Sequence, residues 1–134
     1  MDDKEILLTE WKEVREGLRY FGNKRFAQLT VFLAAEGATL NGFLNSAEGA
    51  DYGYLLPVTG IFLCFIFFIM EYSSVVYWRT FAARGEAIEK QLPPLELMTN
   101  YRPPERGLNC ATRATYLLYL CAAALWVFLA WPAR

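Results

Sequence analysis

The stretch from Leu55 to Met70, LLPVTGIFLCFIFFIM, is the clearest indication of the fold, because none of its side chains carries a charge. It belongs to a longer apolar run that extends from Tyr54 to Trp78. A helix needs about 20 residues to cross the hydrocarbon core of a bilayer, which is about 30 Å thick. The run therefore predicts a transmembrane helix over residues 54–78.

Two further apolar runs, residues 26–44 and 114–131, are long enough for the same role. Of the 134 residues, 55% are hydrophobic. An average globular domain already contains about 45–50%, so it is the clustering of these residues that indicates a membrane protein. Polar residues dilute the run at 26–44: Gln28, Glu36, Thr39 and Asn41. We expect an all-α integral membrane protein with three transmembrane helices.

The positive charges indicate the orientation of the chain. Of the 13 lysines and arginines, six precede the first span, six lie between the second and third spans, and only Arg134 remains. The short connection 45–53 carries only the acidic Glu48 and Asp51. Because Lys and Arg accumulate on the cytoplasmic side of membrane proteins, we expect the N-terminus in the cytoplasm and residues 45–53 outside.

Apolar residues recur at steps of three and four before the first span, and again after the second. This spacing is typical of a helix that packs along a narrow seam. We therefore expect the first two helices to continue side by side into a cytoplasmic helical hairpin, which we call the stalk. The alternative is two amphipathic helices that lie on the membrane surface. The stalk seam consists of Leu7, Trp11, Val14 and Leu18 in the amphipathic helix 1–25, and Phe81, Ile88 and Leu92 in the extension 79–92.

Glycines and prolines mark where helices are expected to bend or end. Gly22 allows either a kink or a continuous helix between the stalk and the first span. A Pro-Pro pair directly after Leu92 ends the second helix. A second pair and Gly107 predict a Pro-rich cytoplasmic loop over residues 93–113. This loop is either a plain connection or a docking segment for a partner protein, because Pro-rich extended segments are ready-made ligands.

Small residues recur at every fourth position of the first span. In lipid, helices associate through close backbone approach, so such a ladder marks a helix-packing face. Two interpretations remain open, which are packing within one chain and an interface between identical chains. The small-residue ladder consists of Thr30, Ala34, Ala38 and Gly42.

Glu36 places a carboxyl group in the middle of the first span. A charge at that depth is unfavourable by at least about 2.5 to 3.5 kcal/mol, so the side chain should face protein or water. One hypothesis is a ring of carboxylates in an oligomer that lines a cation path, with Thr39 and Thr59 as further polar groups. The other is a neutral, hydrogen-bonded carboxylic acid that holds helices together. Its candidate partners are then the hydroxyls of Thr59, Tyr116 and Tyr119.

Charged residues gather at the predicted inner boundary of the membrane. Glu71 lies at the level of Lys24, Arg25 and Arg79. An ion pair with one of these three residues is expected to set the register of the helices rather than to perform chemistry. Arg19 lies close to the same boundary, where long basic side chains reach lipid headgroups.

Several kinds of functional site are excluded by composition. The chain contains no histidine, and its three cysteines show no metal-ligand spacing. No phosphate-binding or dinucleotide-binding glycine motif, no HExxH and no CxxC occurs. We therefore expect no enzyme activity, no cofactor, no metal and no nucleic-acid partner.

The segment EWKEVREGLRYFGNKRFAQLTVFLA (residues 10–34), the second span and its tail ARGEAIEKQL (residues 83–92) resemble uncharacterised small bacterial helical membrane proteins. In these proteins a charged helix leads into the first of two spans, and the second span ends in a charged helix. A similar arrangement occurs in SLATT-type membrane effectors, which are linked to nucleotide-signalled defence and proposed to perforate the membrane. This chain differs from them by its third span. The resemblance implies a multi-pass protein of the bacterial inner (cytoplasmic) membrane that acts as an oligomeric pore or effector.

Two functional hypotheses follow from these patterns. The first is a homo-oligomeric channel, pore or membrane-perturbing effector in the lipid bilayer, which its cytoplasmic helices gate. The second is a non-catalytic accessory or scaffold subunit of a larger membrane complex, whose stalk docks on a cytoplasmic or membrane protein partner. A closed ring of identical chains supports the first hypothesis, and a single copy among unlike subunits supports the second.

Overall fold

The computed structural model describes residues 3–45, 54–92 and 105–131, and all three segments are helical. The helices are α1, Asp3–Leu44; α2, Leu55–Glu89; and α3, Glu105–Ala130. The prediction of an all-helical protein is therefore confirmed for this part of the chain. The expected external loop at 45–53 and most of the Pro-rich loop lie outside the described residues.

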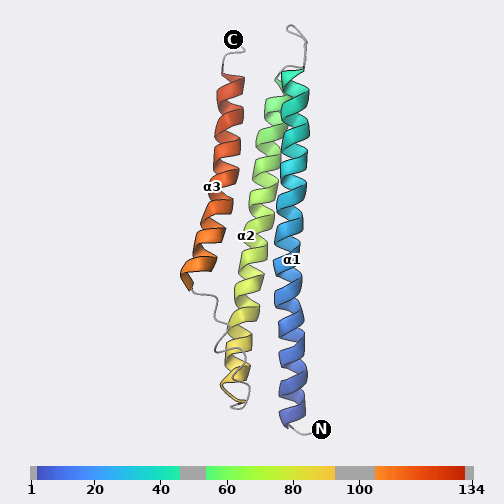
Figure 1. Ribbon diagram of the computed structural model, residues 1–134, viewed down its shortest axis with the longest axis vertical. Coiled ribbons are helices and arrows are strands. Elements are labelled where there is room, and N and C mark those ends of the chain that lie inside the picture. The colour runs from blue at the N-terminus through green and yellow to red at the C-terminus, as the bar shows by residue number, and fades with distance from the viewer. Residues whose placement is uncertain (1–2, 46–53, 93–104, 132–134) are drawn as a thin grey trace.

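The three helices lie roughly parallel to one long axis (Figure 1). Helices α1 and α2 form an antiparallel pair, and α3 packs mainly against α2. The end of α1, the start of α2 and the end of α3 lie at the same end of the molecule (Figure 1). Among the described residues, one half of the molecule is therefore a bundle of three helices, whereas the other half is formed by the α1–α2 hairpin.

Helix α1 is continuous over its 42 residues. Gly22 produces no break, and a Cβ atom added at this position would meet nothing within 4 Å. Glycine in a helix interior is unfavourable by about 1 kcal/mol, which the packing of the flanking turns against α2 readily offsets. Of the two expectations for this region, the structure shows the continuous helix.

Helix α3 begins at Glu105, so the expectation of a loop up to residue 113 was wrong for its last nine residues. The reason is the position of the second Pro-Pro pair, which directly precedes the helix. Proline is tolerated at a helix start, because the first backbone N–H groups have no intrahelical acceptor there. Gly107 lies in the first turn and does not prevent the helix.

Two of the helices are long and apolar enough to cross a membrane, α2 and the part of α3 over Cys110–Ala130. Only 28% of the apolar window of α2 and 11% of that of α3 are buried inside the molecule. The core helix of a soluble protein would be mostly buried, whereas these helices expose their apolar side chains. Helix α1 does not meet the same criterion.

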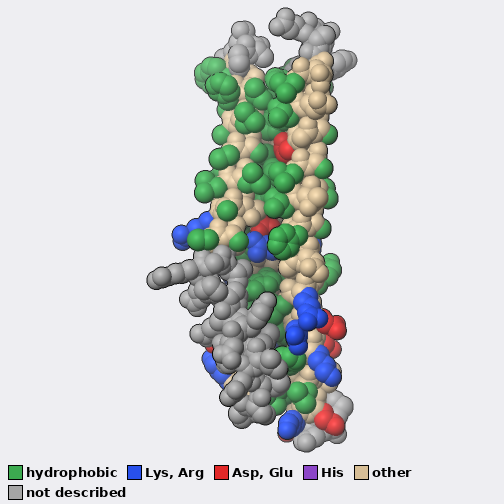
Figure 2. Space-filling view, viewed as in Figure 1, with side chains coloured by type: hydrophobic (Ala, Val, Ile, Leu, Met, Phe, Trp, Pro, Cys, Tyr) green, Lys and Arg blue, Asp and Glu red, His purple; other side chains and the backbone are tan. Residues whose placement is uncertain are grey.

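The buried side chains form two separate clusters. The three-helix half contains Phe32, Cys64, Phe67, Tyr119 and Trp126. The hairpin half contains Trp11, Val14, Ile88 and Leu92. Hydrophobic side chains cover the surface of the three-helix half, and most of the visible charged side chains lie on the hairpin half (Figure 2).

Candidate functional site

Glu36 joins all three helices. The indole Nε1 of Trp126 in α3 donates a hydrogen bond of 2.6 Å to Glu36 Oε2. The thiol of Cys64 in α2 donates one of 3.3 Å to Glu36 Oε1. Both carboxyl oxygens are therefore bound within the chain. This geometry supports the hypothesis that Glu36 holds the helices together more than it supports a ring of free carboxylates.

A glycine makes room for the Trp126 side chain. A Cβ atom added at Gly60 would overlap the indole ring, so only glycine lets α3 approach α2 this closely. The edge of the ring also meets Phe43 of α1, with ring centroids 5.9 Å apart. Trp126 is 1% exposed and is thus fixed from three sides.

The hydroxyl groups expected to bind Glu36 do not do so. Thr59 donates to the backbone oxygen of Leu55 instead, and the hydroxyl of Tyr119 has no hydrogen-bond partner. Tyr116 packs its ring on Phe68. Trp126 and Cys64 were not predicted as donors, because only hydroxyl groups were considered. A buried tryptophan normally finds an acceptor for its N–H, and that was the available signal.

The polar side chain of Thr39 is likewise satisfied locally, because its hydroxyl donates to the backbone oxygen of Ala35. This bond is common for threonine in membrane helices and leaves no free donor. Thr39 and Thr59 thus make no contact with the Glu36 carboxyl through their hydroxyls.

A buried ion pair connects the same three helices at the end of the bundle that adjoins the hairpin half. Arg25 Nε of α1 donates to Glu71 Oε1 of α2 at 2.8 Å. A second guanidinium nitrogen donates to Thr112 Oγ1 of α3 at 3.3 Å. The Glu71 side chain is 2% exposed and that of Arg25 17%. Among the three basic residues expected to pair with Glu71, the structure thus selects Arg25.

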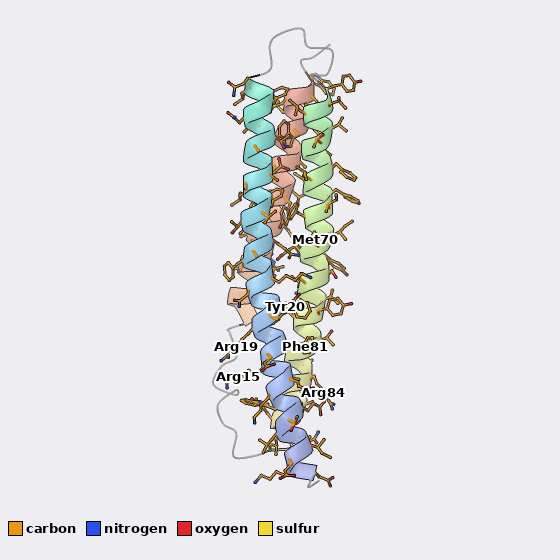
Figure 3. The ribbon with its side chains drawn as sticks, turned by 90° about the vertical axis from the view of Figure 1, so that its right-hand side faces the viewer. Arg15, Arg19, Tyr20, Met70, Phe81 and Arg84 are labelled. Atoms are coloured by element: carbon orange, nitrogen blue, oxygen red, sulfur yellow. The ribbon has the colours of Figure 1, made fainter. Side chains whose placement is uncertain are left out.

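The other basic residues of this region contact no carboxylate among the ion pairs of the described residues. Arg19 and Arg79 are exposed. The ammonium group of Lys24 lies 5.7 Å from the centre of the Phe21 ring. Figure 3 shows Arg15 and Arg19 on a side of α1 that faces away from α2. The expected contact of this basic surface with lipid headgroups stays a prediction.

The stalk residues pack together as one cluster. Trp11, Val14, Ile88 and Leu92 are buried, and Leu7, Leu18 and Phe81 pack against them. Phe81 lies between the two helices (Figure 3), and a Cβ atom added at Gly17 would approach its ring to 2.9 Å. Arg84 donates a hydrogen bond of 2.6 Å to Glu10 across the hairpin. The two segments are thus packed on each other along their length.

The small-residue ladder of α1 lies on the outside of the molecule. Thr30, Ala34, Ala38 and Gly42 are all exposed. The hydroxyl of Thr30 donates to the backbone oxygen of Phe26, one turn earlier in the same helix. Of the two interpretations left open for the ladder, this exposure favours an interface with another chain. The helix instead uses Gln28, Phe32 and Glu36 to contact α2 and α3.

The exposed surfaces of the helices differ in composition. Around the ladder, α1 also exposes Gly37 and the polar Asn41, and beside them the apolar Phe26, Val31 and Leu33. Helices α2 and α3 expose large apolar side chains, as a helix in contact with lipid does. These include Phe62, Phe65, Ile69, Leu117, Leu120, Leu125 and Phe128.

Among the residues with described side chains, no group of three or more His, Cys, Asp or Glu could hold a metal ion. All three cysteines, Cys64, Cys110 and Cys121, are free. The chain matches no protein-family model, no curated protein and no solved structure. The candidate functional features are therefore the exposed α1 face, the stalk and the buried polar contacts.

Proposed function

We propose that this chain is a small homo-oligomeric protein of the bacterial inner membrane, a pore or membrane-perturbing effector that its cytoplasmic stalk controls. The single observation that carries the proposal is the exposed face of α1, formed by Thr30, Ala34, Gly37, Ala38 and Asn41. We call these five residues the α1 face.

The proposal requires α1 to cross the membrane together with α2 and α3. Phe32 of α1 contacts the ring of Phe67 in α2 and the ring of Tyr119 in α3, at centroid distances of 5.4 and 4.7 Å. Residues 26–44 therefore lie against the apolar parts of both candidate spans. If those two helices are in the bilayer, α1 is in it as well. The positive charges at its N-terminal end support an N-terminus in the cytoplasm.

The α1 face is poorly suited to contact with acyl chains. It offers little apolar area, and Asn41 adds an amide group. Its small side chains instead allow another helix backbone to approach closely, which is how helices associate in lipid. The large apolar residues on α2 and α3 suit lipid contact. This asymmetry favours an assembly in which α1 is inside and α2 and α3 are outside.

The occupant of the α1 face in this proposal is the α1 helix of a second copy. Thr30, Gly37 and Asn41 are about two and three helical turns apart and share one side of the helix. Several copies of α1 around a common axis would line that axis with these small and polar residues. Glu36 is not part of this lining, because its oxygens accept hydrogen bonds from α2 and α3.

The stalk provides the means of control. It continues from the same two helices without a break, so a protein or nucleotide signal that tilts the hairpin would also move the α1 face. The stalk cluster is separate from the cluster of the three-helix half. The stalk can therefore be rearranged without unfolding the membrane part.

The proposal is tested with the full-length chain reconstituted into liposomes, by measuring release of a trapped fluorescent dye and K⁺ flux. The variant Ala38→Leu places a bulky side chain on the α1 face, and Ala124→Leu makes the same change on the exposed surface of α3. We expect wild-type vesicles to leak, Ala38→Leu to reduce the leak at least about tenfold, and Ala124→Leu to leave it unchanged. Wild-type vesicles that stay sealed would contradict the pore and favour the accessory subunit.

A further inference from the structure

A layer of buried polar side chains crosses the bundle where the hairpin joins the three-helix half. Its ion pair, Arg25 with Glu71, is bonded to Thr112 as described above. About one turn after the ion pair in each of the two helices, Ser74 of α2 meets Gln28 of α1. The Ser74 hydroxyl donates to Gln28 Oε1 at 3.3 Å and to the backbone oxygen of Met70 at 2.9 Å. We call this set the polar layer: Arg25, Gln28, Glu71, Ser74, Thr112 and Tyr119.

Two atoms of the polar layer are buried without any hydrogen-bond partner in the protein. They are Nε2 of Gln28 and the hydroxyl of Tyr119. Gln28 is 7% exposed and Tyr119 is 2% exposed. If the Gln28 amide is rotated by about 180°, its nitrogen and oxygen exchange places. One of these two atoms is still left without a hydrogen-bond partner.

The Tyr119 hydroxyl lies within electrostatic range of the ion pair. Its ring is held edge-on against Phe32. Tyrosine side chains on a helix point towards the helix N-terminus, which is the direction from Tyr119 to Thr112. The hydroxyl also interacts electrostatically with Glu71 and Arg25. The unpartnered hydroxyl and the ion pair thus belong to one site.

We propose that the polar layer binds water, with at least one water molecule bonded to the Tyr119 hydroxyl or the Gln28 amide. Buried polar groups that lack a protein partner are usually satisfied by internal water, which makes about three hydrogen bonds. A water molecule can both donate and accept hydrogen bonds. It therefore suits a site that contains an amide, a hydroxyl and a carboxylate.

Other occupants fit the polar layer less well. The charges of Arg25 and Glu71 cancel, so the site does not select an anion or a cation. Glu71 and Tyr119 are too deeply buried for a lipid headgroup to reach. Arg25 is the most exposed member of the pair, so water from the cytoplasmic side can exchange past its guanidinium group.

The first test is hydroxyl-radical labelling by X-ray irradiation of the wild-type chain in liposomes, because radicals formed from bound water modify the side chains next to it. Trp126 is the internal control, since it is 1% exposed and its N–H is bonded to Glu36. We expect labelling of Tyr119 to exceed that of Trp126 several-fold. Labelling of Tyr119 no stronger than that of Trp126 would overturn the proposal.

The second test is the sign of a stability change. Tyr119→Phe removes a hydroxyl that bonds water in a hydrated layer, and we expect the melting temperature to fall. In a dry layer the same change removes an unsatisfied polar group, and the melting temperature stays the same or rises. Tyr72→Phe is the matched control, because Tyr72 is exposed. An unchanged or higher melting temperature for Tyr119→Phe, with no change for Tyr72→Phe, would contradict bound water, whatever the oligomeric state of the chain.

Discussion

Trp126 donates its indole hydrogen to Glu36 over 2.6 Å, although the two residues are 90 positions apart in the sequence. The bond gives the acid in the middle of α1 a partner from α3, and the thiol of Cys64 adds one from α2. A carboxyl group at the membrane centre is tolerated when protein groups replace its hydration. Glu36 thereby ties the third helix to the hairpin.

Glu36→Gln is expected to keep the fold and the liposome leak of the wild type. The amide retains an oxygen for the Trp126 N–H, and the α1 face is unchanged. Trp126→Phe, in contrast, leaves a carboxyl oxygen without a donor and should lower the free energy of unfolding by about 1–3 kcal/mol. Thermal unfolding in detergent measures the stability of both variants. Loss of the leak in a correctly assembled Glu36→Gln protein would restore the carboxylate-ring hypothesis.

Gly60→Ala should destabilise the bundle by about 1–3 kcal/mol, because the added methyl group overlaps Trp126 and forces it away from Glu36. Gly22→Ala is the matched control, since nothing lies within 4 Å of its added Cβ atom. It should stabilise α1 by about 0.5–1 kcal/mol. Both changes in stability are measured by unfolding the protein in detergent while circular dichroism monitors the loss of helix. Equal effects of the two substitutions would show that α3 does not pack on α2 as described.

Replacing one partner of the buried ion pair should lower the stability of the protein more than replacing both partners. Glu71→Leu leaves the Arg25 guanidinium without its carboxylate, which is expected to lower stability by about 3–5 kcal/mol. The double variant Arg25→Met, Glu71→Leu should recover much of this loss. The exposed pair of Arg84 with Glu10 serves for comparison, and Arg84→Met should change stability by at most about 1 kcal/mol. A double variant less stable than Glu71→Leu would refute the pairing.

Ile88→Ala should loosen the stalk without unfolding the membrane part. Ile88 is 0% exposed, and such a truncation lowers stability by about 2–5 kcal/mol. Because the stalk cluster is separate, limited proteolysis should cut the stalk of this variant faster while the three-helix half stays intact. Ile6→Ala, at an exposed stalk position, should be cut at the wild-type rate. Cleavage spread equally over the whole chain would contradict two separate clusters.

The helices themselves could be predicted from the sequence, because their signals are local. The spacing from Leu7 to Leu18 and the uncharged run from Leu55 each depend only on neighbouring residues. The rotation of one helix against another is not local, and for this reason the donors to Glu36 were missed. The ladder at Thr30 was predicted to be a packing face, but its spacing does not tell whether it faces inward or outward. The start of α3 at Glu105 was missed because prolines before a helix resemble prolines in a loop.

The proposed function depends on association of the α1 face with a second copy of the chain. Native mass spectrometry of the protein released from lipid nanodiscs tests it most directly, with Ala38→Leu and Ala124→Leu as paired variants. For the wild type and for Ala124→Leu we predict a single assembly. Its mass should equal that of two or more copies of the 15.4 kDa chain. Ala38→Leu should shift the particle towards the single chain. A wild-type particle of 15.4 kDa would contradict the account.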